Sequence, residues 1–153
     1  MITSGSLLQE WCARVLNNQR VAMQQRLLSD VIMRDVIAAS AQPAHWSPQG
    51  VFRKQFLNED NVPTAYDVAY TCSAGLCMRL QGVFDYQQQR WLRQRRIVLG
   101  RAPFKEVRLT PVLSTGTQQA LVHHVATQMV GQEPHNTLVA TYRLRSVAVP
   151  YAG

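Results

Sequence analysis

Apolar residues recur every three or four positions through the first forty residues, and this spacing predicts amphipathic helix. There are two such runs, formed by Leu7, Leu8, Trp11, Val15 and Leu16, and then by Val21, Leu27, Leu28, Val31, Ile32 and Val36. Ser6 and Gln9 have the spacing of a capping box, so the helix is expected to begin near Ser6. Asn17 and Asn18 separate the runs, and asparagine favours helix caps. The pattern predicts either two helices that meet at these asparagines or one long helix that ends near Ala39.

Turn-forming residues interrupt the pattern over residues 41–63, which predicts a connector. They are Pro43, Pro48, Gly50 and Pro63. At most one short helical turn is expected in this connector, at residues 52–57. Trp46 and Phe52 are expected to anchor the connector against the helix, because large aromatic side chains dominate packing energetics.

From residue 64 onward polar and apolar residues alternate, which predicts β-strands. Strands are expected over residues 65–71, 78–84, 91–99, 107–113 and 138–149. Residues 118–130 are ambiguous: the flanking Thr117, Gly131 and Pro134 resemble helix start and stop signals, yet the apolar residues within the segment alternate as in a strand. We favour a strand there, because it would form a long hairpin with the strand that follows. A helix at 118–130 remains the alternative.

Together these elements predict an α+β fold in a single domain of residues 1–153. Residues 1–40 are helical, residues 41–63 are the connector, and residues 64–153 are mostly β. We expect the N-terminal helix or helix pair to pack on one face of a mostly antiparallel sheet of about five or six strands. The helix residues expected to cover this sheet are Leu8, Trp11, Val15, Leu28, Val31 and Ile32.

Length and composition agree with a folded domain. A chain of 153 residues with 46% hydrophobic residues can bury a substantial core, which excludes intrinsic disorder. No apolar run approaches the roughly 18 residues of a membrane span, and residues 1–8 lack the features of a secretory signal. We therefore expect no direct membrane span in this chain.

The positive charge is concentrated in one segment. The chain has 16 basic and 9 acidic residues, for a formal charge of +7. Residues 90–108 contain seven basic residues and one acidic residue, and so carry six of the seven excess charges. Arginine outnumbers lysine by 14 to 2, and its planar guanidinium suits ordered contacts with carboxylates and phosphates. Local charge of this kind points to partners rather than to fold.

Cys72 and Cys77 flank a short Ser-Ala-Gly-Leu segment. If Ala74 and Gly75 form a tight turn, the two cysteines face each other across a hairpin at a separation that permits a disulfide. An oxidised pair would place the protein in the periplasm or another extracytoplasmic compartment, whereas a reduced pair would fit the cytoplasm. Both states remain open. Cys12 is expected to be a core thiol beside Trp11.

No residue pattern predicts catalysis, a metal or a cofactor. His123 and His124 are adjacent, so on a strand they would point to opposite faces, and His45 and His135 are isolated in loops. Asp30 and Asp35 are five residues apart on the helix and do not share a face. Phosphate-binding and nucleophile motifs are missing, because the glycines do not cluster. An enzyme is therefore the less favoured class, although a site assembled from distant residues leaves no local signature.

The basic segment is the best candidate for partner binding. Its residues are Arg90, Trp91, Arg93, Arg95, Arg96, Arg101 and Arg108. Arginine interleaved with tryptophan and glutamine is typical of surfaces that bind single-stranded nucleic acid. As a strand, the segment would place Trp91, Arg93, Arg95 and Ile97 on one face. Neither face would be cleanly apolar, so the strand is expected at an edge of the sheet or on a sheet face covered by a partner. At an edge, its arginines would prevent unwanted pairing.

The favoured hypothesis is a non-enzymatic assembly or protein-interaction domain whose partners are other proteins, including copies of itself. A helix followed by a β-meander with a stapled hairpin is the general plan of pilin-like domains and of cone-shaped periplasmic domains. By this fold-level analogy we expect an extracytoplasmic component of a bacterial secretion, conjugation or pilus-type machine. The alternatives are a nucleic-acid-binding module that uses residues 90–108 and a small enzyme or ligand-binding α+β cone.

Overall fold

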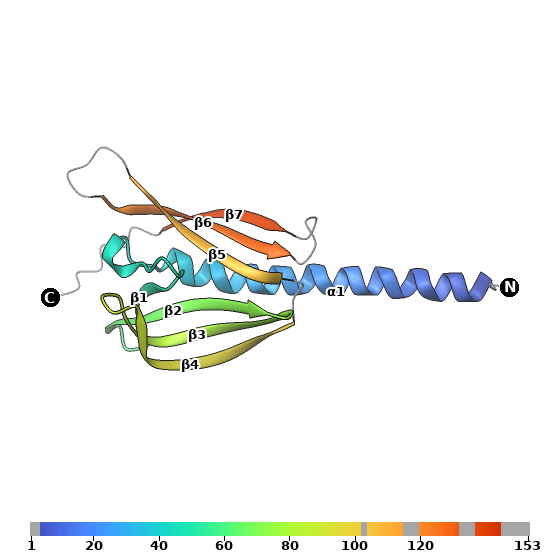
Figure 1. The fold of residues 1–153 in the computed structure, drawn as a ribbon, viewed down its shortest axis with the longest axis horizontal. Helices are drawn as coiled ribbons and strands as arrows, with labels where there is room; N and C mark the ends of the chain where they lie inside the picture. Colours follow the sequence, from blue (N-terminus) through green and yellow to red (C-terminus); the bar gives the residue numbers. More distant parts are fainter. Residues whose placement is uncertain (1–3, 102–103, 115–119, 132–136, 145–153) are drawn as a thin grey trace.

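The N-terminal third forms one continuous helix, α1 (Ser4–Ile37), as the long-helix alternative predicted (Figure 1). The computed structural model describes residues 4–101, 104–114, 120–131 and 137–144. Asn17 and Asn18 lie within α1 and do not break it. Because both asparagines are exposed, their side chains interact with water and the helix passes through them.

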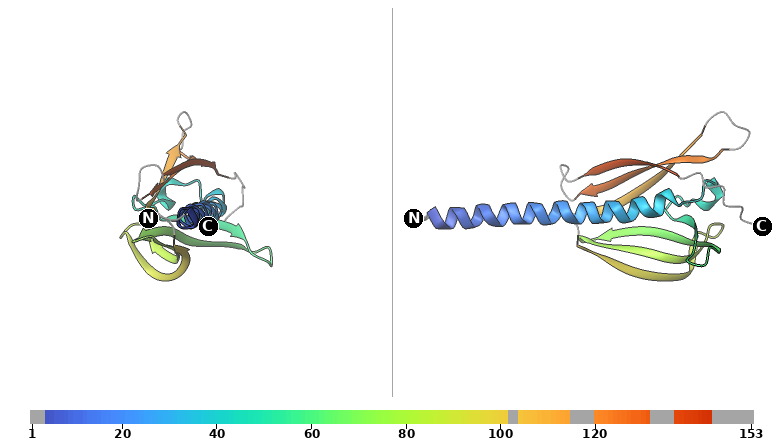
Figure 2. Two further views of the ribbon diagram at one scale, coloured as in Figure 1. Left: turned by 90° about the vertical axis from the view of Figure 1, so that its right-hand side faces the viewer. Right: turned by 180° about the vertical axis from the view of Figure 1, so that it is seen from behind.

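Only the C-terminal half of α1 is packed. Leu28, Ile32 and Val36 are buried, and Val31 is half-buried beside them. By contrast, Leu8 and Trp11 are 60% and 61% exposed, so the expectation that they cover a sheet is wrong. Val15 is half-buried. We call residues 4–20, which project beyond the sheets in Figures 1 and 2, the stalk.

Within the described residues, seven strands form two antiparallel sheets rather than one sheet of five or six strands. Sheet A has the order β1 (Phe52–Leu57), β2 (Pro63–Ser73), β3 (Leu76–Asp85) and β4 (Arg90–Arg101). Sheet B has the order β5 (Phe104–Leu113), β6 (Val122–Gly131) and β7 (Leu138–Arg143). The buried half of α1 lies between the two sheets, and we call this three-layer part the head (Figure 2).

The main core fills the space between α1 and the inner faces of both sheets. Phe52 and Val68 contribute to it from sheet A, and Phe104, Val125 and Met129 contribute from sheet B. A second, smaller cluster lies on the outer face of sheet A and consists of Val51, Ala69, Leu80 and Phe84, with Tyr86 and Trp91 packed against it. Sheet A therefore buries apolar side chains on both faces.

The connector differs from its prediction at one element. Residues 52–57 form strand β1, not a helical turn, and the short helical element of the connector is a 3₁₀ turn at Pro43–His45. Trp46 stacks on Phe52 with ring centroids 5.0 Å apart, and its Nε1 donates to the Ser40 carbonyl at 2.8 Å. Both aromatic residues are buried, so the expectation that they anchor the connector is confirmed.

In the ambiguous segment 118–130, the chain forms strand β6 from Val122 onward, as we favoured. β6 pairs with β5 on one side and with β7 on the other, and Val125 and Met129 face the core. Residues 118 and 119, residues 145–149 of the last expected strand, and His135 lie outside the described residues.

The hairpin between β2 and β3 holds the disulfide. Ala74 has a φ of 51 degrees and Gly75 a φ of 79 degrees. Positive φ at both central residues is the geometry of a type I′ hairpin turn. This turn sets Cys72 opposite Cys77, and their sulfur atoms are bonded with Cα atoms 4.1 Å apart. Cys12 is a free, exposed cysteine on the stalk, so the expectation of a core thiol is wrong.

Candidate interaction surface on strand β4

The Arg-rich segment forms an edge strand of sheet A, one of the two positions expected from the sequence. β4 pairs with β3 on one side only (Figure 1). All five of its arginines are exposed: Arg90, Arg93, Arg95, Arg96 and Arg101. Within the described residues, the backbone of β4 makes no hydrogen bond outside its own sheet. The strand thus presents both arginine side chains and free backbone groups.

A bulge changes which residues share a face. Arg93 pairs with Val83 and Trp91 pairs with Phe84, so Leu92 lies between the two registers. Trp91 is therefore on the outer face beside Phe84, and the expectation that it shares a face with Arg93 and Arg95 is wrong. Paired residues of an antiparallel sheet point to the same side. Arg95 pairs with Gln81 and Ile97 with Arg79, which reaches α1, so Arg93, Arg95 and Ile97 lie on the inner face.

Trp91 packs against the apolar cluster on the outer face of sheet A. Its ring packs edge-to-face on Phe84, with centroids 5.2 Å apart, and the residue is half-buried. Edge-to-face packing is a favoured aromatic geometry in cores. Because Trp91 is half-buried, part of its surface is covered within the protein and is not available to a partner.

The arginines of β4 differ from the other basic residues of sheet A. Arg53 lies 3.2 Å from an Asp67 oxygen, and Lys54 and Arg79 lie 2.8 and 2.7 Å from Asp35 oxygens. No carboxylate of the described chain lies within ion-pair distance of any arginine on β4. The charge of β4 is therefore uncompensated locally.

An open groove of about 410 Å³ adjoins the middle of β4. It is lined by Ala65, Tyr66, Gln81, Gly82, Val83, Arg93, Gln94 and Arg95. At its wall, Arg79 Nη1 donates to Gln81 Oε1 at 2.5 Å. Gly82 is required where the strands approach closely, because a Cβ at this position would lie 2.1 Å from the Arg93 carbonyl oxygen.

The structure brings together six of the seven predicted partner-binding residues. Arg90 to Arg101 lie on β4, whereas Arg108 lies on β5 in sheet B. The Arg108 guanidinium forms an exposed ion pair with Glu106 at 2.8 Å. This pair lowers the pKa of Glu106 and raises that of Arg108. Arg108 is therefore separate from the β4 surface, and its charge is paired with that of Glu106 on the same strand.

A buried charged cluster between α1 and sheet A was not predicted from the sequence. Asp35 accepts hydrogen bonds from Lys54, Arg79 and the Tyr70 hydroxyl. Burial by itself would raise the pKa of Asp35, but these hydrogen bonds hold it below its ordinary value. Burial and the Asp35 charge raise the pKa of Tyr70. Asp35 lies three residues after Ile32 and four after Val31, and this spacing was the available signal that it faces the core.

A second buried carboxylate lies on the outer face of the same sheet. Asp67 accepts from the Phe84 backbone N–H at 2.7 Å and from the Tyr86 hydroxyl at 2.7 Å, besides its ion pair with Arg53. Burial, followed by the contact with Asp67, raises the pKa of Tyr86. Both buried carboxylates are saturated with donors, which fits a structural role more closely than proton transfer.

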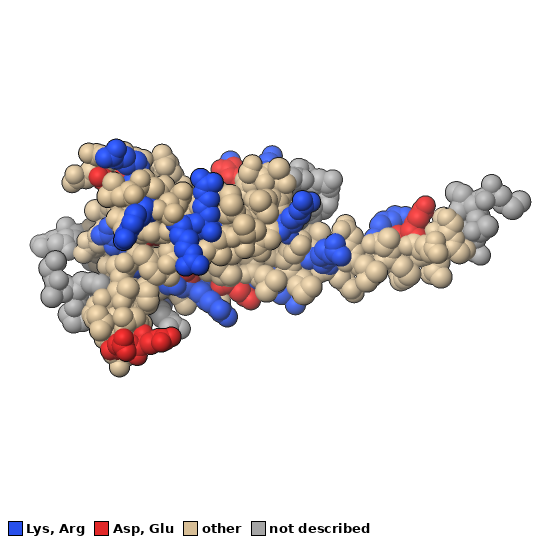
Figure 3. All heavy atoms as spheres, turned by 90° about the horizontal axis from the view of Figure 1, so that it is seen from below, with Lys and Arg blue, Asp and Glu red and all other residues tan. Residues whose placement is uncertain are grey.

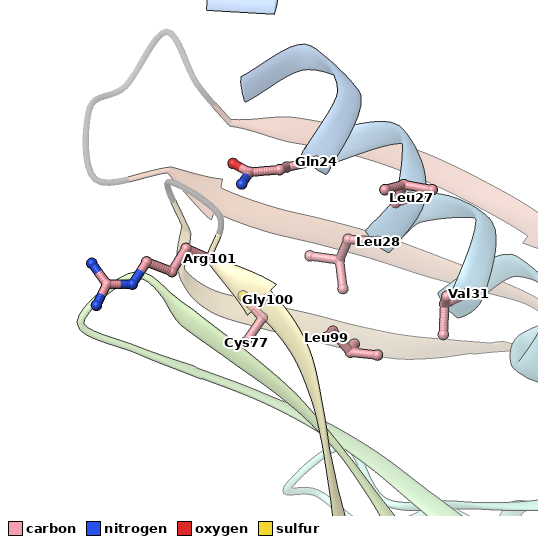
Figure 4. Close-up of a pocket in the computed structure, with 8 residues that line it drawn as sticks. All are labelled: Gln24, Leu27, Leu28, Val31, Cys77, Leu99, Gly100 and Arg101. Carbon is pink, nitrogen blue, oxygen red and sulfur yellow. The ribbon is translucent and has the colours of Figure 1, made fainter. Parts of the chain in front are cut away.

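A partly open pocket lies where α1 leaves the head, between the helix and the ends of β3 and β4 (Figure 4). Its volume is about 240 Å³, and Leu28, Val31 and Leu99 supply much of its lining. The Arg101 side chain points away from it in Figure 4. Pockets for small molecules usually measure about 300–1,000 Å³ and converge several polar groups. This pocket is smaller and mainly apolar.

Other classes of site gain no support from the described residues. They contain no group of three or more His, Cys, Asp or Glu side chains placed to hold a metal ion. Among them α1 is long, but too polar to cross a membrane. In Figure 3, seen from the side of sheet A, Lys and Arg atoms recur across the head and along the stalk, while acidic atoms gather mainly at one corner of the head.

Comparisons with known proteins identify no relative: no family model, no curated protein and no solved structure matches this chain.

Proposed function

We propose that this protein is a non-enzymatic interaction domain that binds an acidic segment of another protein along β4. One observation carries the proposal: the basic residues of β1 and β3 are each bonded to a carboxylate, whereas the five arginines of β4 have no carboxylate partner in the described chain. Uncompensated arginine on an exposed edge strand is a ready surface for an anionic partner.

Two further features support a role in assembly. The stalk carries exposed apolar residues, and the head contains a disulfide. Disulfides are typical of extracytoplasmic proteins. Head-and-stalk shape and disulfide together are compatible with the wider proposal of an extracytoplasmic component of a bacterial secretion, conjugation or pilus-type machine.

Binding of a model acidic polypeptide tests the proposal. Poly-L-glutamate labelled with a fluorophore should bind at low salt, and the affinity should fall as salt is added. The double variant Arg93→Gln/Arg95→Gln should lose most of this binding. The matched control is Arg14→Gln/Arg20→Gln, which removes the same charge from the stalk and should bind nearly as well as the wild type. Equal losses in both variants would show non-local attraction and contradict the proposal.

Nucleic-acid binding is the second candidate, because phosphates also attract unpaired arginines. The same assay with a single-stranded oligonucleotide separates the two candidates. Since Trp91 packs on Phe84, we expect weaker binding of the oligonucleotide than of an acidic polypeptide at equal salt. Tighter, Arg95-dependent binding of the oligonucleotide would favour the second candidate.

A further inference from the structure

The free edge of β4 points to a specific mode of binding. We propose that an acidic segment of the partner adds to β4 as a fifth strand of sheet A, with its carboxylates placed against Arg93, Arg95 and Arg96. This inference rests on the proposed function and adds the conformation and the contact pattern of the partner.

The backbone of β4 is suited to strand addition. Residues 93–98 pair with β3 without a register shift, between the irregularities at Val83/Phe84 and Cys77/Met78. In a strand, alternate residues direct their backbone N–H and C=O groups to opposite edges. Half of these groups bond to β3, and the others face an edge that no described element covers. An extended peptide can satisfy them, as in other cases of strand addition to a sheet edge.

The side chains of β4 define what the added strand should contain. Arg93 and Arg95 lie on the inner face, whereas Gln94, Arg96 and the exposed Val98 lie on the outer face. Cross-strand neighbours on one face approach to about 5 Å, so carboxylates opposite these arginines would form direct pairs. On the inner face the groove beside Tyr66 and Gln81 leaves room for a glutamate side chain. The expected segment is therefore extended and acidic, with an apolar residue opposite Val98.

An acidic peptide fits this edge better than a nucleic acid does. A peptide supplies alternating backbone donors and acceptors along the free edge as well as negative charge, whereas the phosphate backbone of a nucleic acid supplies acceptors but no matching row of N–H donors. The half-burial of Trp91 beside Phe84 also leaves less of its surface available for base stacking.

Backbone methylation of a probe peptide tests strand addition directly. The probe is an extended eight-residue peptide rich in alternating glutamate and valine, with fluorescence anisotropy as the readout. N-methylation of alternate amides blocks hydrogen bonding along one edge only, and the complementary set of methylations blocks the other edge. We expect one methylated peptide to bind at least tenfold more weakly than the parent and the other to bind within about threefold of it.

The outcomes separate this inference from the proposed function. If both methylated peptides bind as well as the parent while Arg93→Gln/Arg95→Gln still abolishes binding, strand addition is overturned and the proposed function stands. If neither the probe nor poly-L-glutamate binds at low salt, strand addition and the proposed function are both contradicted. The arginines would then serve only to prevent pairing at the sheet edge. Displacement of the probe by an oligonucleotide of equal charge at lower concentration would also overturn the inference.

Reversal of the charge at Arg95 distinguishes a lost contact from a misfolded variant. Arg95→Glu should lose affinity for the acidic probe at least tenfold and should recover part of that affinity with a probe in which only the glutamate opposite residue 95 is replaced by lysine. Because the same variant gains one ligand as it loses the other, unfolding cannot produce this pattern. Failure of Arg95→Glu to discriminate between the two probes would contradict the placement of carboxylates against Arg95.

Discussion

Asp35 of α1 and Arg79 of β3 form a buried two-point ion pair, with Nε–Oδ2 and Nη2–Oδ1 distances of 2.7 and 3.1 Å. The two residues are 3% and 8% exposed. The pair ties the last turns of the helix to the middle of sheet A, and Arg79 in turn bonds to Gln81 at the groove. Asp35 of α1 therefore holds the Arg79 side chain, and Arg79 in turn holds Gln81, which lines the groove beside β4.

Removal of this carboxylate is expected to destabilise the head strongly. Asp35→Asn would leave Arg79 and Lys54 without their counter-charge in a buried site, and breaking such a pair costs about 3–5 kcal/mol. Urea unfolding at neutral pH measures the change. The exposed pair of Glu106 and Arg108 supplies the control, because Glu106→Gln should leave the free energy of unfolding unchanged. An Asp35→Asn variant as stable as the wild type would show that Arg79 finds another partner.

The same pair predicts a loss of stability in acid. The pKa of Asp35 is lower in the folded protein than in the unfolded chain, so the unfolded chain takes up a proton first as the pH falls. The stability that ionised Asp35 gives to the folded protein is complete above the unfolded pKa of about 3.9, and it is lost as the pH drops through the lower folded pKa. Unfolding measured from pH 6 down to pH 2 should show the gap between wild type and Asp35→Asn narrowing below about pH 4. A gap that stays constant to pH 2 would contradict this assignment.

The sequence was sufficient for most elements because their signals are local. Helical spacing predicted the range of α1, and alternation predicted β2 to β7 with small differences at their ends. β1 was missed because Lys54 occupies an inward position in Phe52–Leu57, which hides the alternation. Its partner Asp35 lies 19 residues earlier, and such a pairing has no local signal. The division of the strands into two sheets depends on long-range packing, so it also could not be predicted from the local sequence pattern.

The candidate site was predicted in part for the same reason. Charge clustering is visible in the sequence, and it located the arginines of β4. The bulge at Leu92, which moves Trp91 to the outer face, depends on pairing with β3. Arg108 is close in sequence but belongs to the other sheet, because the chain changes sheets between β4 and β5. Proximity in sequence therefore overestimated the size of the surface.

Thiol counting tests the disulfide. The native protein should react with one equivalent of a thiol reagent, at the exposed Cys12, and the unreduced, denatured protein should again show one. Reduction should raise the count to three. The variant Cys72→Ser/Cys77→Ser should lose about 2 kcal/mol of stability, because the bridge closes only a short loop. Three reactive thiols without reductant would remove the disulfide and weaken the extracytoplasmic proposal.

Gly82 should tolerate no side chain. A Cβ at this position would lie 2.1 Å from the Arg93 carbonyl oxygen, so Gly82→Ala must separate β3 from β4. We expect a loss of about 1–3 kcal/mol from overpacking and a weaker affinity for the acidic probe. Hydrogen exchange of the β4 amides would localise the change. Gly5→Ala is the control, because open space surrounds that position; equal stability of the two variants would show that the strands can shift without cost.

The stalk should contribute little to the stability of an isolated head. Ile32 is fully buried, and Ile32→Ala should cost about 2–5 kcal/mol. Trp11 is larger but mostly exposed. Trp11→Ala therefore removes few contacts, and it should change the free energy of unfolding by less than about 0.5 kcal/mol.

Thermal unfolding of both variants at low and high protein concentration measures this difference between Ile32 and Trp11. Val139→Ala is the control, because Val139 is an exposed apolar residue of sheet B. If Trp11→Ala destabilises the protein only at high concentration, the stalks associate with each other. A contact between molecules stabilises the fold by mass action and so depends on concentration, whereas a contact within one molecule does not.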